Sequence, residues 1–165
     1  TSGCAYVFIR EQNQWYMQAK LVGNDLTVHD RFGSSVDICG ERIVVGAPGD
    51  YANSVSSGSA YVFHRTNTTW TETSKLVGDN SIKNRRFGRS VSISGSLIAV
   101  GAPSPGLGST GPGCVYMFEY QAGSWIRYEK LQGSDSEEDD YFGASVQLKL
   151  LIYIFKLMLS NPFVF

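Results

Sequence analysis

One pattern returns along this chain at a constant spacing of 55 residues, and it constrains the fold more than any local propensity does. Residues 31–48 read RFGSSVDICGERIVVGAP, residues 86–103 read RFGRSVSISGSLIAVGAP, and residues 141–148 begin a third copy, YFGASVQL. Aromatic, glycine and lysine positions recur at this spacing: Phe32, Phe87 and Phe142; Trp15, Trp70 and Trp125; Gly3, Gly58 and Gly113; Lys20, Lys75 and Lys130. A fixed period marks an array of similar units that bury their apolar faces against one another.

Each period contains four short segments with the composition of β-strands. Residues 32–38 and 42–48 are β-rich and are joined by a turn at Gly40, while 59–65 and 70–78 alternate in character along the chain. No segment has the 3.6-residue periodicity of a helix. We therefore predict an all-β protein of four-stranded antiparallel units, which is typical of β-propeller blades.

The period also divides the chain. Residues 1–22 are predicted to form strands three and four of a preceding blade, 32–78 and 87–133 are complete blades, and 142–148 is the first strand of a further blade. A closed propeller has about four to eight blades. We therefore interpret the sequence as a fragment of a propeller.

The final segment, KLLIYIFKLMLSNPFVF at 149–165, breaks the repeat. We interpret it as non-native sequence read past a splice or frame boundary. A divergent buried strand and a membrane anchor are the alternatives. A membrane span needs about 20 apolar residues, and Lys156 and Pro162 interrupt this one.

The paired FG and GAP segments, with GSAYVF at 58–63 and KLVG at 75–78 between copies, resemble the FG-GAP repeats of integrin α-chain propellers and of other FG-GAP repeat proteins. The resemblance covers residues 3–148. It implies a partial β-propeller in which the FG and GAP segments of neighbouring blades pack together near the axis. The small residues after Phe32 fit this packing, because inner strands that approach closely leave room only for small side chains.

Integrin-type repeats often carry an Asp-rich calcium loop between strands one and two. Here that position holds only ICGER at 38–42 and ISGSL at 93–97, so the calcium role does not carry over. The remaining acidic cluster lies at 133–143, GSDSEEDDYFG, and its weak metal candidates are Asp135, Asp139 and Asp140. Most of its counterparts in the other repeats are neutral or basic, so we interpret it as a solvated loop and expect no metal and no cofactor.

Several function classes are disfavoured by composition. The formal net charge is −1, so there is no basic field to attract nucleic acid. The only two histidines, His29 and His64, have no repeated nucleophile or carboxylate partner, and we expect no enzyme activity. The three cysteines are too few for a disulfide framework and are interpreted as free or buried thiols.

We expect a non-catalytic extracellular or cell-surface module for binding or cell adhesion, a fragment of an integrin-α-like FG-GAP propeller. Two alternatives stay open: an accessory propeller of a larger secreted enzyme, of the hydrolase or phospholipase type, and a purely structural repeat array. The N-x-T sequon at Asn67, in a predicted hairpin turn, favours secretion and glycosylation. Membrane contact is expected only through parts outside this chain.

The predicted partner is a protein or glycan that binds the face carrying the long loops. Because strands alternate in direction, these loops share one end of the blades: 24–31, 79–86 and 134–141, with 49–57 and 104–112. Side chains there that depart from the repeat are interpreted as freed from packing, and interfaces favour Tyr and Arg. The candidate ligand-binding residues are Asp50, Tyr51, Arg86 and Tyr141.

Overall fold

The computed structural model describes residues 2–52, 55–78, 86–103, 111–135, 137 and 140–149. All the regular structure in these ranges is β-strand or turn, which confirms the all-β prediction. The interpretation of the apolar tail concerns a segment that lies outside the described residues except for Lys149.

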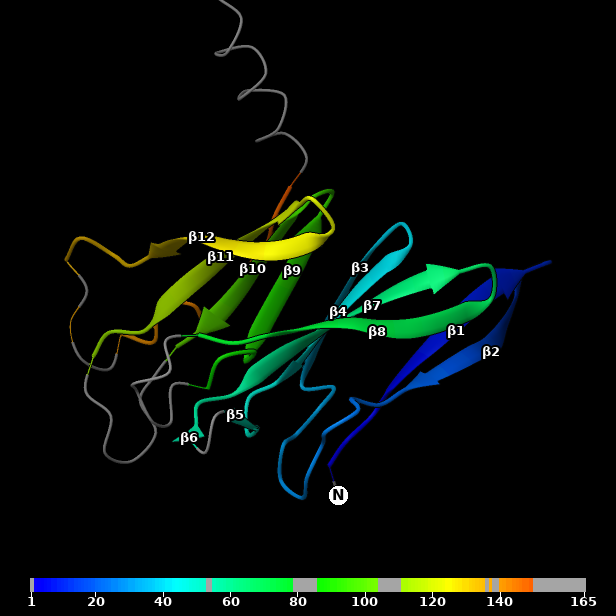
Figure 1. The fold of residues 1–165 in the computed structure, drawn as a ribbon, viewed down its shortest axis with the longest axis horizontal. Helices are drawn as coiled ribbons and strands as arrows, with labels where there is room; N and C mark the ends of the chain where they lie inside the picture. The colour runs from blue at the N-terminus through cyan, green and yellow to red at the C-terminus, as the bar shows by residue number, and fades with distance from the viewer. Residues whose placement is uncertain are drawn as a thin grey trace, which may run out of the picture.

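The strands follow the predicted segments closely (Figure 1). In chain order they are β1 (Ala5–Glu11), β2 (Gln14–Leu21), β3 (Ser35–Cys39), β4 (Arg42–Ala47), β5 (Tyr51–Ala52), β6 (Val55–Ser56), β7 (Ser59–Thr66), β8 (Thr69–Leu76), β9 (Ser90–Ser94), β10 (Leu97–Ala102), β11 (Cys114–Gln121) and β12 (Ser124–Leu131).

Two antiparallel four-stranded sheets form, in the orders β3-β4-β7-β8 and β12-β11-β10-β9. The strands β1 and β2 form a separate pair at the N-terminal end. Open four-stranded sheets of this kind confirm the prediction of a partial propeller built from blades. One element was not predicted: β5 and β6 form a small hairpin of two residues a side within the loop between β4 and β7.

The outer strand pair of each blade carries the same irregularity. The register shifts between Val7 and Phe8 in β1, between Val62 and Phe63 in β7, and between Met117 and Phe118 in β11. A β-bulge of this kind bends a strand and increases the local twist. Its return at the same repeat position gives the three outer pairs a common shape, so that successive blades fit one another.

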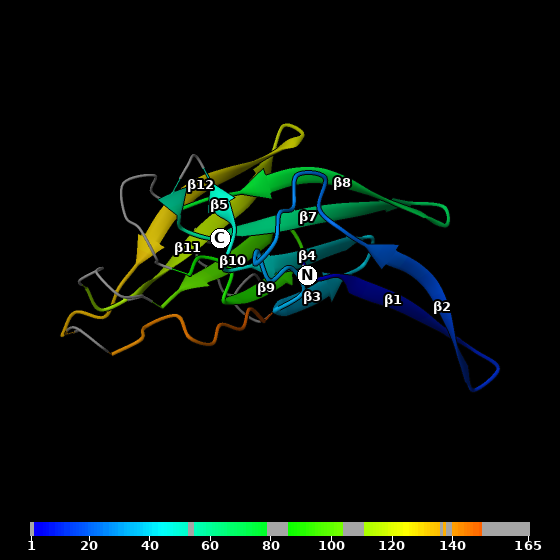
Figure 2. The same ribbon diagram turned by 90° about the horizontal axis from the view of Figure 1, so that it is seen from below.

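The blades stack face to face, with β3 and β9 as neighbouring inner strands (Figure 2). Phe32 and Phe87 are each buried in the interface that their own blade makes with the blade before it. Phe32 packs edge-on against Tyr61 at 5.4 Å and against Phe63 at 6.1 Å between ring centroids. Phe87 repeats this arrangement with the equivalent rings of β11, at 5.3 and 6.1 Å.

Backbone contacts between blades account for the paired FG and GAP segments. The Phe87 N–H donates to the carbonyl of Ser57 in the preceding blade at 2.9 Å, and Phe32 makes the equivalent bond at 2.8 Å. The carbonyl of Gly88 lies against Cα of Gly46, the glycine of the preceding GAP segment, and a Cβ at position 46 would overlap that oxygen. The Ser35 hydroxyl donates to the same carbonyl at 2.8 Å. Glycine is therefore required at position 46 by the blade that follows.

We predict that Gly46→Ala destabilises the protein by about 3 kcal/mol, because the added methyl must push a neighbouring backbone aside. The glycine does not have a positive φ, so the loss reports steric overlap alone. Urea denaturation followed by tryptophan fluorescence measures it.

Gly40→Ala is the matched control, because Gly40 lies in the β3-β4 turn with open space around its Cα. Its φ of +57° limits the expected loss to about 1 kcal/mol. Equal losses in the two variants would contradict the close approach of the blades at Gly46.

Candidate functional site

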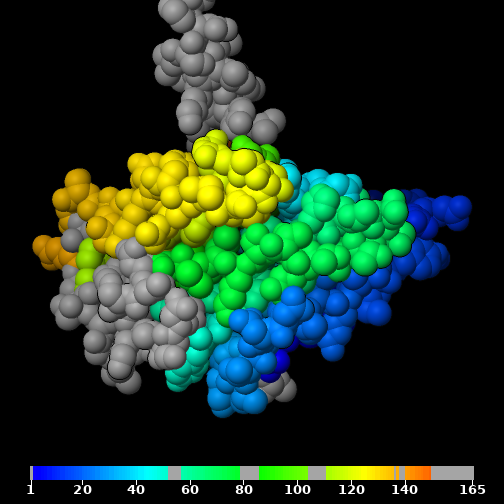
Figure 3. All heavy atoms as spheres, viewed as in Figure 1, coloured from blue at the N-terminus to red at the C-terminus, as the bar shows by residue number. Residues whose placement is uncertain are grey.

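The long loops gather at one end of the blades, and the tight hairpin turns lie at the other (Figure 1). The connections that leave β2, β8 and β12 and the connection between β4 and β7 all belong to the first end, which we call the long-loop face. In Figure 3 the three outer strand pairs appear as adjacent yellow, green and blue bands, and the loop that follows β2 lies beside the chain around β5. The rigid stack of sheets thus presents several loops together.

Three of the four predicted ligand-binding side chains are exposed on these loops. Tyr51, at the start of β5, is 62% exposed, Tyr141 is 47% exposed, and Arg86 is also exposed. Their side chains are therefore available to a partner.

The backbone at two of these positions is fixed by the repeat. Arg31, Arg86 and Tyr141 occupy equivalent places, and all three have left-handed φ values, of 58°, 52° and 54°. Each carbonyl accepts a hydrogen bond from the amide three residues later, at 3.2, 2.9 and 2.9 Å. The turn before each FG segment is therefore constant, whereas the side chain that it projects varies between repeats.

Asp50 differs from the other three candidates, and the expectation that it is freed from packing is wrong. The residue is 3% exposed. Its Oδ2 accepts a hydrogen bond from the Tyr61 hydroxyl at 2.7 Å and pairs with Lys75 Nζ at 2.7 Å. Its carbonyl also accepts the Gly58 N–H at 3.0 Å. Asp50 departs from the repeat because it makes an additional internal contact, not because packing releases it.

Asp25 completes this group from the loop that follows β2. Its Oδ2 pairs with Lys75 Nζ at 2.6 Å, and its Oδ1 accepts the Tyr61 hydroxyl at 2.8 Å. The Lys75 ammonium also lies 5.1 Å from the centroid of the Tyr61 ring. We call Asp25, Asp50, Tyr61 and Lys75 the Lys75 cluster. The Lys75 ammonium and the Tyr61 hydroxyl thus each contact two carboxylates, which come from two different loops.

Burial and charge set the protonation states in the Lys75 cluster. Burial alone would raise the pKa of Asp25, but the hydrogen bonds from Lys75 and Tyr61 outweigh it and lower that pKa below 3.8. Burial alone would lower the pKa of Lys75, but the two carboxylates raise it above 10.5. Burial, followed by the hydrogen bonds to both carboxylates, raises the pKa of Tyr61. Across the neutral pH range Asp25 is therefore ionised, Lys75 is protonated and the Tyr61 hydroxyl is neutral.

The repeat itself supplies part of the Lys75 cluster. Lys20 lies over the ring of Tyr6 at 5.9 Å and Lys130 over that of Tyr116 at 5.5 Å, as Lys75 lies over Tyr61. The equivalent positions 25, 80 and 135 are aspartate, asparagine and aspartate. Asp50, in contrast, has no acidic equivalent in the other repeat. The 55-residue repeat identifies the lysine and tyrosine positions, but it does not predict that Lys75 and Tyr61 bind Asp50.

The loop between β2 and β3 is held at further points. The Asn24 N–H donates to Glu72 Oε2 at 2.9 Å, and the Gly49 N–H donates to the Asp30 carbonyl at 3.0 Å. Together with the Lys75 cluster, these bonds join the loop to β8 and to the chain that follows β4. The scaffold therefore fixes the base of the long-loop face around Tyr51.

The weak metal candidates are placed as follows. Asp140 Oδ2 accepts the N–H of Glu137 at 2.7 Å, and the buried Asp30, in the equivalent position, accepts the N–H of Thr27 in the same way. These aspartates stabilise turns. Asp139 lies outside the described residues, and Asp135 is exposed. Among the residues that the structure describes, no group of three or more His, Cys, Asp or Glu side chains is placed to hold a metal ion.

Asn67 lies in the β7-β8 turn with a φ of 59° and an exposed side chain. This turn belongs to the hairpin end of the blades, away from the long-loop face. A glycan at Asn67 would leave that face open. In the described part of the chain, no helix is long and apolar enough to cross a membrane.

A family model described as FG-GAP repeat matches residues 15–63 and again residues 70–118. Each match begins at the outer strand of one blade and ends in the third strand of the next, so it spans the contact between blades. No curated protein matches the chain.

Replacing Lys75 with methionine leaves two carboxylates together without their cation. We expect Lys75→Met to lower the free energy of unfolding by about 3 kcal/mol at pH 7. The loss should shrink toward pH 5, because protonation of one carboxylate relieves the repulsion in the folded state. In the unsubstituted protein the contribution of Asp25 is lost only as the pH falls below 3.8, and that of Lys75 only as it rises above 10.5.

Lys20→Met is the control, because no carboxylate is bound to Lys20 among the described residues. Its expected effect is within about 0.5 kcal/mol. Denaturant unfolding at pH 5 and pH 7 compares the two variants. A loss at Lys75 that does not depend on pH, or an equal loss at Lys20, would show that the cluster has no electrostatic role.

Proposed function

The chain belongs to the FG-GAP repeat family, and from this premise we propose that it is a non-catalytic binding module of the cell surface or extracellular space, with cell adhesion as its context. The observation that carries the proposal is the long-loop face, where exposed aromatic and basic side chains extend from loops whose bases are fixed. Such an arrangement suits recognition of a protein or a glycan, because anchors held in place lose little conformational entropy on binding.

Tyr51, Arg86 and Tyr141 are the proposed anchors. Tyrosine and arginine supply large contact areas with polar ends, which is why they dominate binding energy at interfaces. The backbone of Arg86 and Tyr141 is set by the repeated left-handed turn, and Tyr51 follows directly on the buried Asp50. Asp50 is buried beneath this face, where it binds Tyr61 and Lys75, and it is not proposed to contact the ligand.

The extracellular location is proposed from the Asn67 sequon. The asparagine is exposed in a tight turn, where an oligosaccharide transferase could reach it, and it lies at the end of the blades opposite the anchors. A glycan there would also shield the hairpin end and direct partners to the other face.

We predict that a variant with alanine at Tyr51, Arg86 and Tyr141 loses at least tenfold in affinity for a partner, with stability nearly unchanged because all three side chains are exposed. The protein is produced in a secretory host and screened against arrays of extracellular proteins and glycans. Glycosidase treatment of the same material reports whether Asn67 is modified. Binding is then measured by surface plasmon resonance.

The control variant carries alanine at Glu11, Gln14 and Gln121, three exposed residues of the hairpin end. It should bind as the unsubstituted protein does. A partner whose binding is weakened by the control and not by the anchor variant would place the site on the wrong end. The absence of any partner in the screen would favour a purely structural array.

A further inference from the structure

A basic and aromatic patch lies at the hairpin end, where the blade of β3, β4, β7 and β8 meets the blade of β9 to β12. We call it the Arg42 patch. Its members are Arg42, His64 and Thr71 from the first of these blades and Tyr120 and Trp125 from the second. Both blades have all four strands, so the facing surfaces of the patch are complete on each side.

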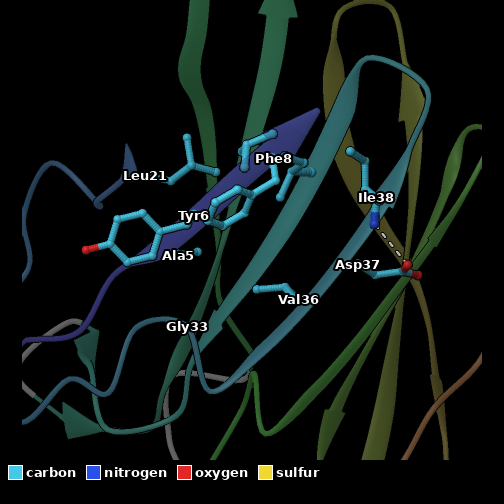
Figure 4. A pocket seen from close by; sticks show the side chains of 10 residues that line it. Ala5, Tyr6, Phe8, Leu21, Gly33, Val36, Asp37 and Ile38 are labelled. Atoms are coloured by element: carbon cyan, nitrogen blue, oxygen red, sulfur yellow. Dashed lines mark hydrogen bonds between the residues drawn. The ribbon is translucent and has the colours of Figure 1, made fainter. Parts of the chain in front are cut away.

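Alternation along β3 shows which side of the first blade faces the second. Figure 4 shows Val36 on one side of this strand and Asp37 on the other. Asp37 accepts a hydrogen bond from the Ile93 N–H of the next blade at 2.8 Å, so its side is the one that faces that blade. Cys39, two residues farther along, lies on the same side. There its Sγ accepts the Gly95 N–H at 3.4 Å.

Strand pairing extends this side outward from Cys39 in a row across the sheet. Cys39 lies opposite Arg42, Arg42 lies opposite His64, and His64 lies opposite Thr71. Residues directly opposite each other in antiparallel strands share one face of the sheet. Arg42, His64 and Thr71 therefore stand side by side toward the next blade, separated by roughly 5 Å from strand to strand.

Arg42 contacts the next blade through a cation–π interaction. Its guanidinium carbon lies 4.5 Å from the centroid of the Tyr120 ring, and that ring lies 5.2 Å from the ring of Trp125. The adjacent carboxylate in the sequence, Glu41, is bound through both oxygens by Arg65, at 2.5 and 2.8 Å. No carboxylate is paired with Arg42 among the described residues. A guanidinium that stacks by its face keeps its in-plane N–H groups for another acceptor.

Trp125 also carries an unpaired donor. In the preceding blade interface, the indole N–H of the equivalent Trp70 donates to Gln18 at 2.9 Å. The position that corresponds to Gln18 is Thr73, whose hydroxyl donates within its own sheet, to the carbonyl of Val62 at 3.2 Å. Within the described ranges, the N–H of Trp125 has no hydrogen-bond partner. One interface thus pairs its indole internally, whereas the other leaves it available.

The chemistry of these groups indicates which ligand they suit. A guanidinium binds a carboxylate through two parallel hydrogen bonds. Indole and imidazole N–H groups and a threonine hydroxyl donate to neutral oxygens, while the two aromatic rings offer apolar surface. An acidic sugar combines a carboxylate, several hydroxyl oxygens and apolar C–H groups on one ring. An acidic peptide side chain offers the carboxylate alone, so the patch favours the sugar.

We propose that the Arg42 patch is a binding site for a carboxylated sugar. The carboxylate pairs with Arg42, the Trp125 N–H and the Thr71 hydroxyl donate to the sugar hydroxyl oxygens, and the sugar ring packs against Tyr120. The site lies at the opposite end of the blades from the long-loop face and does not rest on the proposed function. A glycan on Asn67, in the adjacent β7-β8 turn, would lie next to the patch, so the inference concerns the chain without that glycan.

NMR titration of the full chain, produced in a host that adds no N-glycan, tests the proposal. Methyl glucuronide should shift the indole N–H signal of Trp125, which Trp125→Phe identifies. The indole signal of Trp70 should stay in place, because that N–H is already bound to Gln18. Methyl glucoside, the same sugar without the carboxylate, should bind at least tenfold more weakly.

Arg42→Leu removes the cation and introduces the residue that the next blade has at the equivalent position, Leu97, so the fold should be kept. It should weaken binding of methyl glucuronide at least tenfold. Arg10→Leu is the matched control, because Arg10 is an exposed arginine on β1 at the same end of the blades, and it should leave the affinity unchanged. An unshifted Trp70 signal in both variants checks that they fold.

Four results would each overturn the proposal. They are an unshifted Trp125 signal at saturating methyl glucuronide, equal binding of methyl glucoside, an equal loss of affinity in Arg10→Leu, and tighter binding of a glutamate-rich peptide than of methyl glucuronide. The last result would assign the patch to acidic protein segments instead of sugars.

Discussion

The structure depends on one close approach of two backbones, the carbonyl of Gly88 against Cα of Gly46. The same contact returns between Gly143 and Gly101, and in each case a serine hydroxyl donates to the approaching carbonyl, at 2.8 and 2.7 Å. Because the blades meet at this distance near their inner strands, the aromatic residues farther out interlock at the same depth in each interface. The paired glycines therefore set the geometry of the stack, and the FG and GAP segments are two sides of one contact.

The loops depend on this stack for their own order. The turn before each FG segment repeats because it leads the chain into the contact, and it leaves Arg86 and Tyr141 projecting from a fixed backbone. The Lys75 cluster then joins the loop after β2 to the chain after β4 through two ion pairs of Lys75, one with the exposed Asp25 and one with the buried Asp50. Removing Lys75 costs more than the pair with Asp50 contributes, because the Asp50 carboxylate stays buried without its cation. This part of the face is held by electrostatics that the other repeats do not share.

Much of the fold could be predicted from the period of 55 residues, since recurring Phe, Trp, Gly and Lys positions locate the strands and their faces. The features that the sequence did not predict are local. A single departure from the repeat, such as Asp50, looks the same in the sequence whether the residue is free of packing or makes a new internal contact. The partners of Asp50 in the structure, Asp25, Tyr61 and Lys75, are also distant from it in sequence. The β5-β6 hairpin pairs only two residues a side and leaves no alternating pattern.

Amide hydrogen exchange at Phe87 tests the central claim most directly, because its N–H donates to Ser57 in the preceding blade and joins no strand pair of its own sheet. If the FG segment locks the blades together, this amide should exchange as slowly as the central-strand amides of β4 and β10 when followed by NMR. Exchange as fast as that of the β1-β2 turn at Gln12 and Asn13 would mean that the blades separate without unfolding. In that case the glycine contact would not hold the array together.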